Sequence, residues 1–174
     1  MHLENLKLVN FKNYSEANIN FSQYINALVG VNGSGKTNLL DAIHFLSMTK
    51  SAFNSQDNQS ILHGQLYYIL TGKFRINSKI KTISNSLEQN KRKKIQINKK
   101  SIDKAADFIG LFPTVLIAPN DHTLITEGSE TRRKYFDSII SQLNKSYLIN
   151  LIDYNHALKQ RNKLLKNFSD RFLL

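Results

Sequence analysis

The pattern of apolar and polar residues along the first two-thirds of the chain predicts a β-sheet. Strand-like runs occupy residues 6–11, 17–21, 25–29, 67–76, 80–85, 94–98 and 115–118. The run at 94–98 alternates between polar and apolar residues, which is typical of a half-buried antiparallel strand. The runs at 25–29 and 115–118 are more continuously apolar, so we expect both to be buried strands.

Two further regions have a helical pattern. Apolar residues between positions 36 and 48 recur at helix-compatible spacing: Leu39, Leu40, Ile43, Phe45 and Leu46. The pattern turns helical again from Glu130, and leucines recur every seven residues at Leu151, Leu158 and Leu165, which predicts a long helix over about residues 145–167. This helix is either the start of a helical arm or an ordinary surface helix packed on its own domain.

These elements predict an α/β fold in two parts. We expect residues 1–120 to form an α/β lobe in which a mixed sheet packs on the helix at 36–48. Residues 121–174 would begin a helical lobe, and the polar stretch at 51–60 would be irregular.

A phosphate-binding sequence joins the strand-like run at 25–29 to the helix at 36–48. Its residues match the pattern G-x-x-x-x-G-K-[ST] without a gap, and all eight are candidate cofactor-binding residues: Gly30, Val31, Asn32, Gly33, Ser34, Gly35, Lys36 and Thr37. The glycines allow successive N–H groups to point inward around an anion, and the helix start directs its positive dipole end at the same place. A chance Gly-rich turn before a helix is the alternative, but the strand, loop and helix context favours a nucleotide site.

Two side chains of this loop have specific chemical roles. The Lys36 ammonium can reach the β- and γ-phosphates of ATP, and the Thr37 hydroxyl is a hard oxygen ligand for Mg²⁺. The sequence therefore predicts ATP and Mg²⁺ as cofactors, with Thr37 as the metal ligand. The histidines are scattered without metal-ligand spacing, and His44 is expected to be a packing residue.

The surrounding residues resemble a known ATPase family. The stretch around the loop reads G-x-N-G-x-G-K-T-N-L-L-D-A-I and is preceded by Asn10-Phe11-Lys12-Asn13-Tyr14. Further matches lie at Val115-Leu116-Ile117-Ala118-Pro119-Asn120-Asp121, at Arg132-Arg133-Lys134-Tyr135-Phe136-Asp137 and at Leu158-Lys159-Gln160-Arg161-Asn162-Lys163-Leu164-Leu165-Lys166. Together they resemble the SMC-like branch of the ABC-type ATPases and, within it, the RecF family, from the first strand to about Lys166.

The resemblance implies a function in DNA replication and recombinational repair. A complete RecF-like protein is expected to form an ATP-dependent homodimer, to bind single-stranded or gapped DNA, and to support recombinase loading and the SOS response with recombination mediator proteins. The alternatives are an SMC-like chromosome-organising or nuclease-partner ATPase with a long coiled coil and, less favoured, a small-molecule P-loop kinase. The resemblance also implies that Lys12 lies near the nucleotide phosphates. Asn54 stands where many members of the family carry Arg, and Arg132 and Arg133 either contribute to a site or form a salt-bridged helix start.

The motifs that ABC-type hydrolysis requires are missing from the 174 residues. No apolar run ends in Asp-Glu, and no Ser-Gly-rich signature loop is present. We therefore expect an incomplete domain, the N-terminal half of a longer protein, that is inactive in hydrolysis by itself and has no catalytic residues of its own.

The charge of the chain favours polyanionic partners. The formal net charge is +11, and eleven basic residues stand between positions 73 and 104: Lys73, Arg75, Lys79, Lys81, Lys91, Arg92, Lys93, Lys94, Lys99, Lys100 and Lys104. Such an excess can bind DNA through its phosphates, with Lys93 and Lys94 as candidate contacts, or it can simply keep a solvated hairpin soluble. The absence of cysteine and of a signal-like N-terminus predicts a soluble cytoplasmic protein with no membrane segment.

Overall fold

The computed structural model describes residues 1–172, including every side chain in that range except those of Asn120, Thr123 and residues 169–172. The chain divides into two compact units. The first is Met1–Leu116 and the second begins at Ile117, so each is described by itself.

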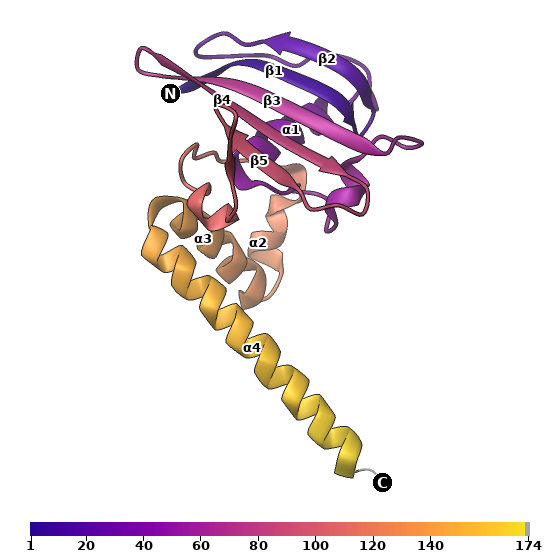
Figure 1. Cartoon of the computed structure of the whole chain (residues 1–174), viewed down its shortest axis with the longest axis vertical. Helices are drawn as coiled ribbons and strands as arrows, with labels where there is room; N and C mark the ends of the chain where they lie inside the picture. The colour runs from indigo at the N-terminus through magenta and orange to yellow at the C-terminus, as the bar shows by residue number, and fades with distance from the viewer. Residues whose placement is uncertain (173–174) are drawn as a thin grey trace. The chain divides into compact units, whose positions relative to one another are not determined.

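The first unit is built on a six-stranded sheet in which every pairing is antiparallel. Its strand order is β2-β1-β3-β4-β5-β6, and Figure 1 shows β2 to β5 in this order. The strands are β1 His2–Phe11, β2 Tyr14–Asn20, β3 Tyr67–Ile76, β4 Lys79–Glu88, β5 Lys94–Ile97 and β6 Lys100–Ile102. Successive strands pair as hairpins except for β3, which pairs with β1 across the sequence that contains the phosphate-binding loop.

One face of this sheet is buried by helix α1, Lys36–Met48. Alternate residues of the strands, such as Leu6 and Leu8 of β1, point into the core, because side chains on a strand alternate between its two faces. Three rings from different elements meet edge to face: the centroids of Phe11, Phe45 and Tyr68 are 5.6–5.9 Å apart. This aromatic contact fixes α1 beneath β1 and β3 and so positions the loop that precedes the helix.

Most of the expected elements of the first unit are confirmed, but two strands are not. The helix at 36–48 and the strand at 67–76 have the bounds that the sequence predicts. Residues 25–29 and 115–118 have no strand structure, and Ile25, Val29, Val115 and Ile117 are between 71% and 89% exposed. A strand is stable only when a neighbouring backbone satisfies its N–H and C=O groups, and no described residue pairs with either segment. The expectation of two further buried strands, and with it the mixed sheet, is therefore wrong for the described residues.

The second unit is helical. It contains a 3₁₀ turn at Pro119–His122 and the helices α2 Thr123–Thr126, α3 Ser129–Leu143 and α4 Lys145–Phe172; the first unit has 3₁₀ turns η1 Asp57–Ser60 and η2 Ala105–Asp107. The predicted long helix is confirmed, since α4 has 28 residues and is about 42 Å long at 1.5 Å per residue. Leu148 near its start is buried, whereas Ile152, Tyr154 and Leu164 are exposed. Within the described residues, no helix combines the length and the apolar character needed to span a membrane.

Candidate functional site

The loop at residues 30–37 has the backbone shape of a phosphate cradle. Gly33 and Gly35 have φ angles of 82° and 100°, in the left-handed region that residues with a Cβ atom rarely adopt. A Cβ atom at Gly35 would also lie 2.6 Å from Asn13 Nδ2 and 2.9 Å from the Tyr14 hydroxyl. Gly33 has no described atom within 4 Å of such a position, so its requirement is conformational rather than steric.

The Lys36 side chain curls back over this loop. Its Nζ atom donates hydrogen bonds of 2.8 Å to the carbonyl oxygens of Gly30 and Val31, which keeps the ammonium at the mouth of the cradle. A cavity of about 290 Å³ lies here, at the N-terminus of α1, and is lined by Asn32, Gly33, Gly35, Lys36, Thr37 and Asn38. A cation and a helix N-terminus that converge on one small polar cavity favour an anion there. Thr37 is exposed, so its hydroxyl is accessible to a metal ion bound with that anion.

The turn between β1 and β2 supports the loop from one side. The Tyr14 hydroxyl donates to the Gly35 carbonyl at 3.2 Å, and the Asn38 amide donates to Asn13 Oδ1 at 2.8 Å. The N–H group of Lys12 in turn bonds the Ser60 carbonyl at 2.9 Å, at the end of η1. The loop, the β1–β2 turn and η1 are thus linked in one hydrogen-bonded arrangement.

A buried carboxylate completes this support. Asp41, on the second turn of α1, accepts hydrogen bonds of 2.7 Å from the Ser51 hydroxyl and from the backbone N–H of Ala52. The Lys12 ammonium lies 2.6 Å from the same carboxylate, and the Lys12 and Asp41 side chains are only 9% and 0% exposed. Lys12 Nζ also lies 5.5 Å from the centre of the Phe53 ring. Sequence reasoning missed Asp41, although a carboxylate among the apolar positions of an amphipathic helix is a signal for a buried ion pair.

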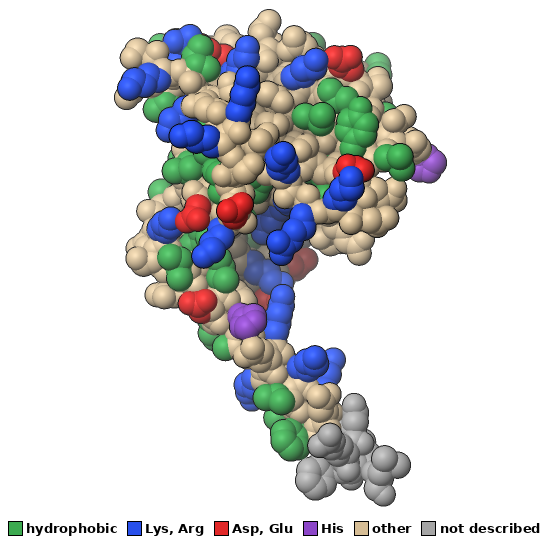
Figure 2. Space-filling model, viewed as in Figure 1, with side chains coloured by type: hydrophobic (Ala, Val, Ile, Leu, Met, Phe, Trp, Pro, Cys, Tyr) green, Lys and Arg blue, Asp and Glu red, His purple; other side chains and the backbone are tan. Residues whose placement is uncertain are grey.

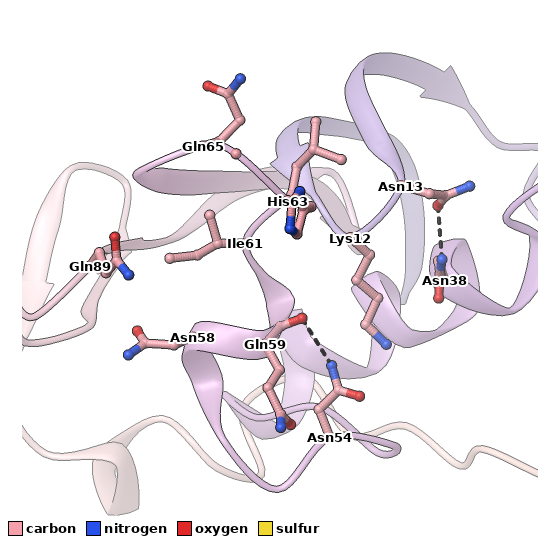
Figure 3. Close-up of a pocket in the computed structure, with 12 residues that line it drawn as sticks. Lys12, Asn13, Asn38, Asn54, Asn58, Gln59, Ile61, His63, Gln65 and Gln89 are labelled. Carbon is pink, nitrogen blue, oxygen red and sulfur yellow. Dashed lines mark hydrogen bonds between the residues drawn. The ribbon is translucent and has the colours of Figure 1, made fainter.

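A second, larger cavity of about 670 Å³ lies beside the loop. Figure 3 shows that side-chain amides surround it, with Lys12 on the same wall as Asn13 and Asn38. The amide-bearing lining residues are Asn13, Asn38, Asn54, Asn58, Gln59, Gln65 and Gln89. Asn54 is held by a hydrogen bond of 3.2 Å from its amide to the Gln59 carbonyl. Because Asn38 lines both cavities, they adjoin each other at the start of α1.

The remaining candidate residues have mainly structural contacts. Arg132 donates to the carbonyls of Leu124 and Glu127, so it caps the end of α2, while the neighbouring Arg133 is exposed. His44 is half-buried, with Nδ1 3.2 Å from the Lys50 carbonyl, and burial lowers its pKa despite the opposing effect of this contact. This half-buried position agrees with the prediction that His44 is a packing residue.

The structure changes the interpretation of Lys93. Its ammonium lies 2.6 Å from Asp57 Oδ2, donates to the Thr49 carbonyl at the end of α1, and is 5.2 Å from the centre of the Phe45 ring. The side chain is 19% exposed. These contacts argue against the expectation that Lys93 contacts DNA phosphates, because its charge joins the segment before β5 to η1 and α1. Whether Lys94 contacts DNA stays a prediction.

Replacing Lys93 should therefore affect stability more than replacing its neighbour. We expect Lys93→Gln to lower the free energy of unfolding by about 1–3 kcal/mol, because the Asp57 carboxylate and the Thr49 carbonyl lose a charged donor. Lys94→Gln, at an exposed position, should change it by less than about 0.5 kcal/mol. Urea unfolding followed by circular dichroism measures both, and equal effects would contradict the structural role of Lys93.

Comparison with known proteins gives consistent matches. The family described as RecF/RecN/SMC N terminal domain matches residues 2–164. A protein of Flavobacterium johnsoniae called DNA replication and repair protein RecF is 47% identical over 169 residues, which are 97% of this chain and 47% of the relative. A protein of Cytophaga hutchinsonii with the same name is 44% identical over 174 residues, or 100% of this chain and 46% of the relative. The chain thus spans about half the length of these curated relatives.

A solved structure shows the same fold. It is described as the recombination mediator protein RecF-ATP in the RecFOR pathway, and it matches this chain with a TM-score of 0.88 and 34% identity. The match covers 95% of this chain and 44% of the solved chain.

Proposed function

The chain belongs to the RecF family, and from this premise we propose that it binds ATP and DNA as part of a DNA replication and recombinational repair protein. The observation that carries the proposal is the convergence of the Lys36 ammonium, the N-terminus of α1 and the glycine-rich loop on one small cavity. Each of these features attracts phosphate for an independent physical reason.

The two adjoining cavities fit the two ends of a nucleotide. The β- and γ-phosphates would lie in the cradle of residues 30–37, where Lys36 can exchange its two carbonyl contacts for phosphate oxygens. The adenine would lie in the amide-rich cavity, whose Asn and Gln side chains offer both donors and acceptors to a base. Lys12 also lines that cavity, while its ammonium is paired with the buried Asp41 carboxylate.

The donor set also fits a magnesium ion bound with the phosphates. Mg²⁺ prefers hard oxygen ligands and commonly uses one or two protein oxygens together with phosphates and water. The exposed Thr37 hydroxyl at the start of α1 is the protein oxygen that we assign to it. When bound, the ion would neutralise charge between the β- and γ-phosphates.

The wider role follows from the relatives. The relatives carry the name DNA replication and repair protein RecF. The protein of the solved structure is described as a recombination mediator in the RecFOR pathway. We propose that the protein to which this chain belongs forms an ATP-dependent homodimer in the cytoplasm, binds single-stranded or gapped DNA, and supports recombinase loading and the SOS response with mediator proteins. The excess of basic over acidic residues supports the DNA part of this proposal.

Lys36→Ala tests the nucleotide site. We expect it to weaken Mg-ATP binding by about 2 kcal/mol, or about 30-fold, because the substitution removes a charge-assisted hydrogen bond to the phosphates. The matched control is Lys50→Ala, which removes an exposed lysine just beyond the other end of α1. Isothermal titration calorimetry with Mg-ATP measures both. Equal affinities of Lys36→Ala and the unchanged chain would refute the assignment.

A further inference from the structure

The phosphate-binding loop contains an asparagine that is followed by a glycine. Asn32-Gly33 is the one Asn-Gly pair in the 174 residues. In such a pair the backbone nitrogen of the glycine can attack the side-chain carbonyl carbon of the asparagine, because glycine has no Cβ atom to obstruct the approach. Asparagine is among the residue types that are chemically labile in proteins. The pair is therefore a candidate for spontaneous modification inside the proposed nucleotide site.

The two residues occupy the centre of an exposed turn. The turn is closed by a hydrogen bond of 3.3 Å from the Ser34 N–H group to the Val31 carbonyl, and both Asn32 and Gly33 are exposed. Within the described part of the chain, no group forms a hydrogen bond with the Asn32 side chain or with the Gly33 N–H group. The space around Gly33 is open, so the turn has room to rearrange. Both reacting groups are thus accessible to each other and to water.

The positive charge of the cradle favours the attack. The glycine N–H group must lose its proton, and the attack places a negative charge on the side-chain oxygen of Asn32. The Lys36 ammonium is held at the mouth of the loop, and the N-terminus of α1 directs its positive dipole end at the cavity that Asn32 and Gly33 line. A fixed positive potential stabilises both anionic species, as an oxyanion hole does in an enzyme. The features that attract a triphosphate therefore also speed the loss of the amide.

The charges around the cradle act in the same direction. The first turn of α1 contains no acidic residue, and none lines the cavity at the loop. The carboxylate on the second turn, that of Asp41, is paired with Lys12. The formal net charge of the chain is +11, and Figure 2 shows more Lys and Arg than Asp and Glu side chains on the face that it draws. The field at the loop is therefore positive in sign.

We propose that Asn32 is a site of spontaneous deamidation and that the resulting carboxylate closes the phosphate cradle to ATP. The Gly33 nitrogen forms a bond with Asn32 Cγ, the bond between Cγ and Nδ2 breaks, and ammonia leaves with the proton of the Gly33 N–H group. Water then opens the five-membered succinimide at one of its two carbonyl groups and returns a proton to the nitrogen. The product is aspartate or isoaspartate at position 32.

The consequence for nucleotide binding follows from the position of the new charge. Asn32 lines the same cavity as Lys36, so a carboxylate there repels a triphosphate and competes with it for the ammonium. Bound Mg-ATP would in turn cover Asn32 and use the backbone N–H groups of the cradle, so it should protect the amide. This consequence rests on the proposed function, whereas the chemical step does not.

Timed incubation of the purified chain tests the proposal. Peptide mapping by mass spectrometry measures amide loss at each asparagine, with and without Mg-ATP, and calorimetric titration with Mg-ATP follows each sample. The comparison site is Asn77, which is also exposed in a two-residue turn but is followed by Ser78. Asn32→Ser cannot form the succinimide, and Asn77→Ser removes a similarly exposed asparagine outside the cradle. Lys36→Ala tests the effect of the positive charge.

We expect Asn32 to lose its amide at least about tenfold faster than Asn77 in the nucleotide-free chain, which corresponds to about 1.4 kcal/mol in activation free energy. Mg-ATP and Lys36→Ala should each slow the reaction at Asn32 severalfold and leave Asn77 unchanged. The number of Mg-ATP sites should fall in step with the modified fraction in the unchanged chain and in Asn77→Ser. In Asn32→Ser it should not change with time. Freshly purified Asn32→Asp should bind Mg-ATP at least about tenfold more weakly than Asn32→Ser.

Amide loss at Asn32 no faster than at Asn77 would overturn the modification site, even if the fresh chain binds Mg-ATP. Modified chain that keeps its full number of Mg-ATP sites would overturn the effect on the cradle. An unchanged rate in Lys36→Ala would overturn the role of the positive charge. If the fresh chain binds no Mg-ATP, the proposed function and the consequence drawn from it fail together, whatever the rate at Asn32.

Discussion

Asp41→Ala is expected to lower the free energy of unfolding by about 3–5 kcal/mol, because it leaves the Lys12 ammonium buried without its counter-charge. The Ser51 hydroxyl and the Ala52 N–H group lose their acceptor in the same substitution. Urea unfolding followed by circular dichroism measures the change. A smaller effect, below about 1 kcal/mol, would show that water or a rearranged side chain replaces the carboxylate.

The double variant Asp41→Ala with Lys12→Met separates the charge from the packing. Lys12→Met keeps an unbranched apolar chain beside Phe53 but removes the ammonium. If the unpaired charge dominates, the double variant should be more stable than Asp41→Ala alone, with a coupling energy that the double-mutant cycle gives directly. If the effects of the two substitutions simply add, the ion pair between Lys12 and Asp41 does not determine the stability of this region.

The sequence predicts the strands and the helix of the first unit well where the hydrogen-bonding partner of each element is close to it in the chain. Residues 67–76 form a strand-like run and pair with β4 through a two-residue turn, so the run and its partner lie side by side in sequence. The backbone N–H and C=O groups of helix α1 form hydrogen bonds within the helix itself. The spacing of its apolar residues is therefore enough to predict where the helix lies in the sequence. The phosphate-binding loop follows from its fixed glycine and lysine positions for the same local reason.

The sequence fails where the partner of an apolar segment cannot be inferred from that segment. Residues 25–29 and 115–118 have apolar side chains, which predicts burial, but a hydrophobic pattern does not say which strand supplies the hydrogen bonds. In the described structure no strand does, and Ile25 is 86% exposed. A strand assignment therefore depends on a long-range partner in a way that a helix assignment does not.

Charged residues are the other place where the sequence is insufficient. Lys93 and Lys94 are adjacent and chemically identical, yet the first is tied to Asp57 and the second is exposed. Adjacent residues in extended backbone point to opposite faces, and only the fold shows which face meets η1. The same applies to Lys12. The family resemblance places it near the phosphates, which is compatible with its position in the wall of the larger cavity, but the resemblance does not reveal its ion pair with Asp41.

Binding and hydrolysis of ATP should separate in this chain. The residues that hold the phosphates in our proposal are present, but the Asp-Glu pair that completes magnesium coordination and orients water is not found in the 174 residues, nor is a signature loop. Asp41 cannot substitute for such a carboxylate, because its oxygens already accept from Ser51, Ala52 and Lys12. A loop that holds the triphosphate without positioning the attacking water stabilises the ground state only.

We therefore expect the purified 174-residue chain to bind Mg-ATP but to release no phosphate above background. Phosphoryl transfer depends almost wholly on positioning and electrostatic stabilisation, so the lack of the water-positioning carboxylate should remove turnover rather than reduce it slightly. Phosphate release measured with Mg-ATP, with Lys36→Ala as the contamination control, checks this directly. Joining the chain to the C-terminal half of a RecF relative should restore slow hydrolysis that responds to DNA, because that half would supply the two missing motifs. Turnover in the isolated chain that disappears in Lys36→Ala would show instead that the catalytic residues lie within these 174 residues.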